Sequence, residues 1–260
     1  MRTRTAAESR TQLIENLKRL GFKYMAENMD EYLDQCEQRK TSVTEFLIEV
    51  TENEIAKKEE RHIQSCVNTA NFPYRKTLDD FDYDFQPSIN RNQIEGFRDL
   101  RFLERNQNIV LVGSSGVGKT HIATAIGIEA AKNGKSTYFI TAADLIQNLK
   151  KASLENRLTD RIRQYSRYRL LIIDEVGYLQ IDDESTKLFF HLISKRHGKK
   201  STIVTTNCEI SKWADTFNDS IIANAIFDRL ADFESPVITI IGPSYRTRHL
   251  ISKQKQRGEQ

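Results

Sequence analysis

Eight residues near the middle of the chain follow the pattern G-x-x-x-x-G-K-[ST] and restrict the possible fold more than any other feature. They read Gly-Ser-Ser-Gly-Val-Gly-Lys-Thr over residues 113–120. A predicted strand precedes them and a predicted helix follows, which is the context that separates a phosphate-binding loop from a chance glycine turn. Glycines let successive backbone N–H groups converge on phosphate oxygens at a helix N-terminus, where partial positive charge favours anions. The segment predicts a nucleotide triphosphate site.

The residues of this loop have separate tasks in binding a triphosphate. We expect Lys119 to bridge the β- and γ-phosphates and the Thr120 hydroxyl to bind Mg²⁺. The predicted nucleotide-binding residues are Gly113, Ser114, Ser115, Gly116, Val117, Gly118, Lys119, Thr120 and His121.

Five short apolar runs with β-forming residues alternate with helical stretches. They occupy residues 108–113, 136–141, 170–174, 201–207 and 237–242. Continuous apolar strands that alternate with helices are typical of a parallel sheet covered on both faces. We therefore predict an α/β fold with a five-stranded parallel sheet.

The chain before this α/β region has the pattern of a small all-helical module. A first helix is predicted to end at Gly21, and a second is predicted over residues 25–33. A third begins where Ser42 and Glu45 form a capping box.

Three regions are therefore expected: a helical module over residues 1–67, a linker over residues 68–95 and a nucleotide-binding domain over residues 96–260. Residues 70–89 contain two prolines and five aromatic residues. Free linkers rarely carry so many rings, so we expect this one to be ordered against a surface.

Composition excludes several classes of protein. Hydrophobic residues make up 38% and charged residues 29% of the 260 residues, which is compatible with folded domains. The three cysteines form no C-x-x-C pair, so neither a disulfide framework nor a thiolate zinc site is indicated. No apolar run approaches the ~18 residues of a membrane span. We expect a cytoplasmic protein that does not enter a membrane.

Acidic and amide side chains stand where two of the predicted strands end. Asp174 ends a buried strand and is expected to orient the magnesium shell, at the sheet edge where ligands of open α/β folds bind. Glu175 is the predicted general base for an attacking water, because hydrolysis needs a proton acceptor near the γ-phosphate. Asn207 is a candidate for orienting that water, although an asparagine at a strand end is more often a turn residue.

Together with "IFDRL" at residues 226–230, these motifs make the chain resemble the AAA+ ATPases. Within that class it is similar to the IstB-like proteins of insertion-sequence transposons, in the IstB/DnaC-like group. The narrower resemblance is carried by the linker residues Phe72, Pro73, Lys76, Thr77, Leu78 and 80–82, and by the ending Ser244, Tyr245 and Arg246.

The resemblance implies that the nucleotide is ATP, bound with Mg²⁺, and it implies roles for two arginines. Arg229 matches the arginine finger, which reaches the γ-phosphate of a neighbouring subunit. The alternative for Arg229 is a surface arginine paired with Asp228 or Asp232. Arg246 is similar to the second sensor, which contacts the γ-phosphate in its own subunit. Only 14 residues follow Arg246, so we expect no full C-terminal helical lid.

A basic stretch between the second and third strands is the predicted DNA contact. It is long enough for two helices, and in the related initiator and loader proteins a helix at this place lines the nucleic-acid channel. Cations here suit sequence-independent contacts to phosphates, although a charged run can also be a solvated helix face. The predicted contacts are Lys150, Lys151, Arg157, Arg161 and Arg163. Weaker candidates are residues 194–200 and the basic C-terminal end. The N-terminal helices are candidates for another DNA or transposase surface, through Arg2, Arg4, Arg10, Lys18 and Arg19.

Three functions remain open on these patterns. The first is an ATPase that forms homo-oligomers with ATP, binds duplex DNA and recruits or activates a transposase. The second is a helicase loader, whose partner is a replicative helicase and whose preferred DNA is single-stranded. The third is a phosphoryl-transfer enzyme acting on a small metabolite. Such an enzyme needs an acceptor pocket, usually under a mobile lid, whereas this chain offers an arginine expected to act in trans and basic helices. The resemblance favours the first.

Overall fold

The computed structural model describes residues 5–39, 42–178, 181–209, 212–232 and 234–248. Two compact units divide the chain, Met1–Ser65 and Cys66–Gln260. No helix among the described residues combines the length and apolarity that crossing a bilayer demands.

Four helices lie among the described residues of the N-terminal unit. They are α1 (Ala6–Arg19), α2 (Lys23–Glu27), α3 (Met29–Arg39) and α4 (Val43–Thr69), of which α4 continues into the second unit. The predicted capping box precedes α4: the Glu45 N–H donates to Ser42 Oγ, and the Ser42 N–H donates to Glu45 Oε2, both at 3.2 Å. Leu17, Met29 and Val50 lie in the small core that holds these helices together.

The prediction of one continuous helix over residues 25–33 is wrong. The helix ends at Asn28, where α2 stops and α3 begins at the next residue. The Asn28 side-chain amide donates to the Tyr24 carbonyl at 2.8 Å. The same carbonyl also accepts the Asn28 backbone N–H at 3.1 Å, and Asn28 itself, with φ −110° and ψ 9°, departs from the helical conformation.

The second unit contains the predicted five-stranded parallel sheet. Its strands are β1 (Ile109–Gly113), β2 (Thr137–Thr141), β3 (Leu170–Val176), β4 (Ser201–Thr206) and β5 (Val237–Ile240). Their order across the sheet is β2-β3-β4-β1-β5, and every pairing is parallel. The α/β prediction is confirmed.

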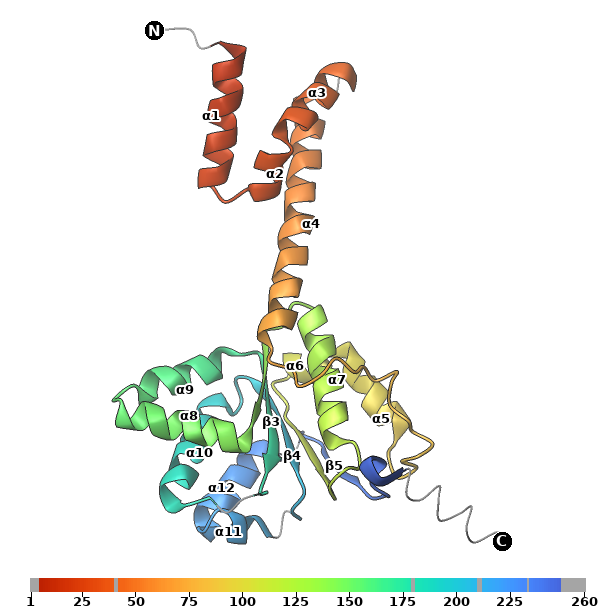
Figure 1. The fold of residues 1–260 in the computed structure, drawn as a ribbon, viewed down its shortest axis with the longest axis vertical. Helices are drawn as coiled ribbons and strands as arrows, with labels where there is room; N and C mark the ends of the chain where they lie inside the picture. Colours follow the sequence, from red (N-terminus) through yellow and green to blue (C-terminus); the bar gives the residue numbers. More distant parts are fainter. Residues whose placement is uncertain (1–4, 40–41, 179–180, 210–211, 233, 249–260) are drawn as a thin grey trace. The chain divides into compact units, whose positions relative to one another are not determined.

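Helices cover both faces of this sheet (Figure 1). They are α5 (Arg91–Gly96), α6 (Arg101–Glu104), α7 (Lys119–Lys132), α8 (Ala142–Leu154), α9 (Leu158–Arg167), α10 (Asp183–Arg196), α11 (Trp213–Thr216) and α12 (Ser220–Leu230), with short 3-10 turns η1 (Phe97–Asp99) and η3 (Tyr245–Thr247). Alternate strand residues divide between two cores: Ile173 packs with α8, α9, α10 and α12, whereas Ile172 packs with α5, α6 and α7. The strands are buried on both faces, which explains their continuous apolar sequences.

The aromatic linker is packed against the face of the sheet that α7 covers. Leu78, Phe81 and Ile89 are buried in the same core as the strand residue Ile172. Burial of these side chains fixes the course of the linker, which brings it to the carboxyl edge of the sheet.

Candidate nucleotide-binding site

The phosphate loop joins the carboxyl end of β1 to the first turn of α7. Gly116 and Gly118 have φ angles of 83° and 105°, in the left-handed region that glycine adopts without steric cost. Gly118 caps α7, so the positive end of the helix dipole faces the loop. A cavity of about 420 Å³ opens here, a size typical of ligand sites. The predicted residues that line it are Ser115, Gly116, Val117, Gly118, Lys119, Thr120 and His121.

The Lys119 ammonium is held inside this loop. It donates to the carbonyl oxygens of Gly113 at 2.7 Å and Ser114 at 2.8 Å. These two predicted residues do not line the cavity, but their carbonyls position the ammonium that does. Burial lowers the pKa of Lys119 from its ordinary value. A cation with so little water around it attracts an anion more strongly than an exposed one.

Asp174 lies beside the loop on β3 and is buried. Its Oδ1 accepts hydrogen bonds from Thr120 Oγ1 at 3.0 Å and from Thr205 Oγ1 at 2.5 Å. Thr120 and Asp174 thus bring together two oxygen ligands of the kind that Mg²⁺ prefers. The described residues contain no group of three or more His, Cys, Asp or Glu side chains that could hold a metal. This arrangement fits Mg²⁺, which is usually held by one or two carboxylates together with substrate phosphates.

Glu175 and Asn207 line the same cavity as the phosphate loop. Both are exposed, and Asn207 directly follows β4. Glu175 has φ 62°, which is uncommon for a residue with a side chain, and its N–H donates to Thr205 Oγ1 at 2.9 Å. A carboxylate and an amide therefore lie together where a water molecule could approach the terminal phosphate.

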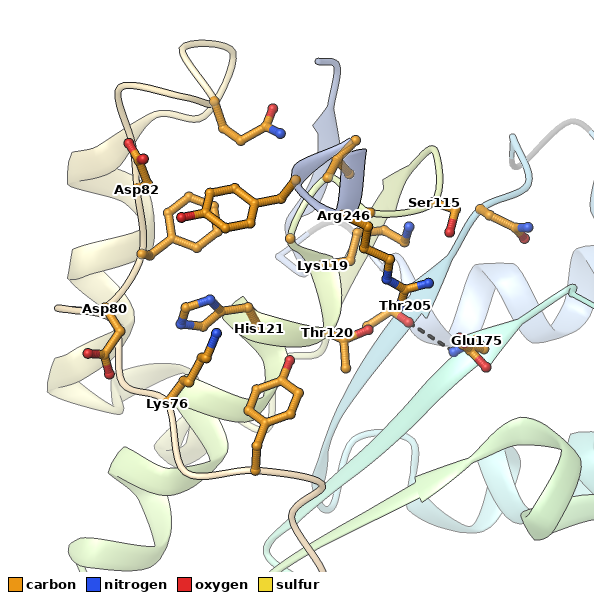
Figure 2. Close-up of a pocket in the computed structure, with 18 of the residues that line it drawn as sticks. Lys76, Asp80, Asp82, Ser115, Lys119, Thr120, His121, Glu175, Thr205 and Arg246 are labelled. Atoms are coloured by element: carbon orange, nitrogen blue, oxygen red, sulfur yellow. Dashed lines mark hydrogen bonds between the residues drawn. The ribbon is translucent and has the colours of Figure 1, made fainter. Parts of the chain in front are cut away.

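The linker forms another wall of the cavity (Figure 2). Its lining residues are Tyr74, Lys76, Asp80, Phe81, Asp82 and Gln86. His121 connects α7 to this wall, because its Nε2 lies 2.8 Å from the Thr77 carbonyl oxygen and its ring packs edge-on against Phe81 at 5.3 Å between centroids. Burial lowers the pKa of His121, which favours the neutral ring. These rings offer an aromatic surface beside the phosphate loop.

The C-terminal turn η3 completes the cavity. The Tyr245 N–H donates to the Gly116 carbonyl at 2.8 Å, and Gln86 Nε2 donates to the Pro243 carbonyl at 2.7 Å. These bonds fasten the turn to both the loop and the linker. Arg246 lines the cavity, and its side chain extends past Lys119 toward Thr120 (Figure 2). A cation from this turn thus faces the same space as the loop lysine.

Arg229 does not line this cavity. Its guanidinium lies 4.7 Å from the ring centroid of Phe190, and its carbonyl accepts from Asn108 Nδ2 at 3.0 Å. Because Asn108 precedes β1, this end of α12 lies at the amino edge of the sheet, opposite the phosphate loop. The ion pairs of the described residues do not join Arg229 to Asp228 or Asp232.

The five predicted DNA-contacting cations lie on α8, on α9 and in the turn between them. They do not line the phosphate cavity. Lys151, Arg157 and Arg163 are exposed, and Arg161 is half-buried with its Nη1 donating to Gln164 at 2.9 Å. Three of the five contact acidic side chains: Lys150 with Asp182, Arg157 with Glu155, and Arg163 with Asp160. Lys150 thereby ties α8 to the N-cap of α10. Arg2, Arg4 and residues 249–260 lie outside the described residues.

Several residues of the site belong to none of the sequence motifs. Thr205 bonds the Asp174 carboxylate and the backbone N–H of Glu175, and it lines the cavity together with Tyr74, Gln86 and Tyr245. The density of aromatic residues in the linker indicated packing against a surface, but no spacing rule connects residues 74–86 with the loop. Thr205 belongs to an ordinary β-rich run, where threonine is common for packing reasons alone.

Gly118→Ala is expected to destabilise the nucleotide-binding unit. An added Cβ would lie 2.6 Å from Phe81 Cε2 on a backbone that disfavours side chains, so we expect a loss of about 1–3 kcal/mol in the free energy of unfolding. Urea unfolding followed by the fluorescence of Trp213, the single tryptophan, reports on this unit. Gly96→Ala is the control, because nothing lies within 4 Å of its added Cβ. Equal unfolding midpoints for the two variants would contradict the expected clash.

Comparison with known proteins gives a consistent result over most of the chain. Residues 15–253 match the family model described as IstB-like ATP binding protein. A Bacillus thuringiensis subsp. berliner protein, described as an ATP-binding protein of insertion sequence IS232, is 50% identical over 243 residues. That alignment covers 94% of this chain and 97% of the relative.

Solved structures share the fold over about two thirds or more of the chain. AMPPCP-bound DnaA from Aquifex aeolicus has a TM-score of 0.56 at 20% identity, over 72% of this chain and 56% of that chain. The DnaC helicase loader has a TM-score of 0.50 at 26% identity, over 66% of this chain and 96% of that chain. The predicted AAA+ fold is confirmed by these likenesses together with the parallel sheet.

Proposed function

Because the chain belongs to the family of IstB-like ATP-binding proteins, we propose that it is an AAA+ ATPase that assembles on duplex DNA and recruits or activates a transposase for insertion at a target site. The observation that carries the proposal is the composition of the cavity. It gathers the phosphate loop, Glu175, Asn207 and Arg246 but not Arg229. The Arg229 guanidinium that completes the site would then come from a second copy of the chain.

The proposed chemistry is hydrolysis of ATP at the γ-phosphate. Thr120 and Asp174 would hold Mg²⁺, which neutralises charge on the phosphates. Glu175 would take a proton from the attacking water. The oxygen of that water would bond to the γ-phosphorus while the bond from this phosphorus to the bridging oxygen breaks. Asn207 would orient this water, and Arg246 would contact the γ-phosphate from within the subunit. The phosphate loop and Lys119 would bind the other phosphate oxygens.

Homo-oligomer formation is the second part of the proposal. Arg229 lies at the opposite edge of the sheet from its own phosphate loop. A guanidinium supplied in trans neutralises transition-state charge and makes hydrolysis depend on assembly. ATP bound between two copies would in turn favour the assembled state, because binding and assembly are thermodynamically linked.

Duplex DNA is the proposed polyanion on which the copies assemble. The cations of α8 and α9 are spread over two helices, and cations so placed suit contacts to phosphates without reading sequence. The transposase is proposed from the printed descriptions of the relatives, which are ATP-binding proteins of insertion sequences. A helicase-loading role is the second candidate, because the DnaC helicase loader is 26% identical over 66% of the chain.

ATPase rates with duplex DNA, with single-stranded DNA and with neither test this proposal. We expect duplex DNA to raise the rate about fivefold or more, with an effect that falls steeply as salt rises. Lys151→Ala with Arg163→Ala should weaken the stimulation. The matched control is Lys132→Ala with Lys135→Ala, which removes two exposed cations elsewhere on the same unit. Stimulation by single strands alone would favour the helicase loader, and stimulation by neither would refute DNA-dependent assembly.

A further inference from the structure

The strand that carries the two carboxylates has a bulge at the cavity. The pairing of β3 with β4 is regular up to Ile173 and resumes at Val176, so Asp174 and Glu175 together face one residue, Thr205. A bulge of this kind leaves one residue outside the ladder and redirects its side chain. Glu175 is the displaced residue, because its φ of 62° lies in the left-handed region.

The bulge has a direct effect on the site. Successive side chains of a regular strand point to opposite faces of the sheet. Asp174 contacts Thr120, and Glu175 lines the cavity to which Thr120 also belongs. The displaced backbone therefore lets two adjacent carboxylates serve one site. An unfavourable backbone conformation persists only where surrounding groups hold it.

The Thr205 hydroxyl holds the backbone of Glu175 in this conformation. Its oxygen accepts the Glu175 N–H at 2.9 Å, and its hydrogen is donated to Asp174 Oδ1 at 2.5 Å. A hydroxyl has one hydrogen to donate and can also accept, so both bonds are compatible. Thr205 is buried although it lines the cavity, so its hydroxyl meets these two partners in place of bulk water. The same side chain thus holds the backbone N–H of Glu175 and a carboxylate oxygen of Asp174.

We infer that Thr205 is a positioning residue for ATP hydrolysis, which keeps Glu175 and Asp174 aimed at the same cavity. The inference rests on the proposed roles of these two carboxylates. Thr205 is buried in the wall of this cavity, and its hydroxyl bonds the Glu175 N–H and the Asp174 carboxylate. It acts through the bulge, so its loss should affect the chemical step more than nucleotide binding.

Thr205→Val tests this inference, because valine keeps the branched shape and removes the hydroxyl. We expect kcat for ATP hydrolysis to fall about 10- to 100-fold, while the Kd for a fluorescent ADP analogue changes less than about threefold. Thr205→Ser restores the hydroxyl and should keep kcat within about threefold of the original. If the valine variant does not fold, Thr205→Ala removes the same hydroxyl with less bulk.

Hydrogen exchange gives a readout that does not depend on activity. Without nucleotide, the amides of residues 174–178 should exchange faster in Thr205→Val, because the Glu175 N–H loses its acceptor. Thr137→Val is the matched control, since its buried hydroxyl bonds the Lys135 carbonyl at the other edge of the sheet. It should alter neither the exchange of this segment nor kcat.

A double-mutant cycle identifies the residue through which Thr205 acts. On a Glu175→Gln background, Thr205→Val should lower kcat by much less than on the original chain, because the general base is already absent. Equal effects on both backgrounds, unchanged exchange, or a serine variant as slow as the valine variant would overturn the inference. If the unaltered protein hydrolyses no ATP, the proposed function fails instead, and the exchange experiment still decides whether Thr205 holds the bulge.

Discussion

Arg229→Ala is expected to lower assembly-dependent ATP hydrolysis by about 10³-fold or more while nucleotide affinity changes less than about threefold. The large effect on rate follows if the guanidinium stabilises transition-state charge in a neighbouring subunit. The small effect on affinity follows from its position, because Arg229 does not line the cavity of its own subunit. Steady-state turnover and equilibrium binding of a fluorescent nucleotide measure the two quantities separately.

Mixing variants makes the Arg229 prediction sharper. A Lys119→Ala chain has a defective phosphate site but an intact Arg229, so it can supply the arginine that an Arg229→Ala chain lacks. Two nearly inactive proteins should therefore regain activity when combined. Arg101→Ala is the control, since Arg101 is an exposed arginine paired with Asp99. Unchanged turnover in Arg229→Ala, or no recovery on mixing, would refute the trans assignment.

Glu175→Gln is expected to lower kcat by about 10²- to 10⁴-fold, because the amide cannot accept a proton from the attacking water. Nucleotide binding should persist, since the phosphate loop and Asp174 are unchanged. The backbone bond from residue 175 to Thr205 should persist as well, because it uses the N–H and not the side chain. Single-turnover hydrolysis measures the chemical step directly.

The control for this variant is Glu184→Gln, which makes the same change at an exposed position in the first turn of α10. We expect its turnover to match that of the original protein. Oligomer formation on DNA with ATP should be prolonged in Glu175→Gln, since the nucleotide that links the copies is not consumed. A glutamine variant with normal kcat would show that another group accepts the proton.

Local patterns predicted the elements of this fold well. Apolar runs located all five strands, and the capping box at Ser42 located the start of α4, because these signals depend on neighbouring residues. The break at Asn28 was missed because the apolar residues keep their helical spacing across it. The spacing of apolar residues alone therefore cannot distinguish one continuous helix from two successive helices.

Sequence motifs identified only part of the cavity lining. The phosphate loop and the strand ends follow motif rules, but Gln86 reaches Pro243 across 157 positions of the sequence. The bulge at Glu175 is equally hidden, because it depends on the register between β3 and β4. The ion pair of Lys150 with Asp182 likewise joins separate helices. Such contacts follow from the tertiary fold, and no local pattern encodes them.

The walls of the cavity come from three stretches that are remote along the chain, represented by Phe81, Gly116 and Tyr245. A ligand that contacts all three stretches stabilises them together, because each stretch would lose its contacts with the ligand if it unfolded locally. Ligand binding to the native state alone adds about 2.7 kcal/mol of stability at a concentration of 100 times Kd. The aromatic segment before α5 and the final turn would therefore resist proteolysis together when nucleotide is abundant, and become susceptible together when it is scarce.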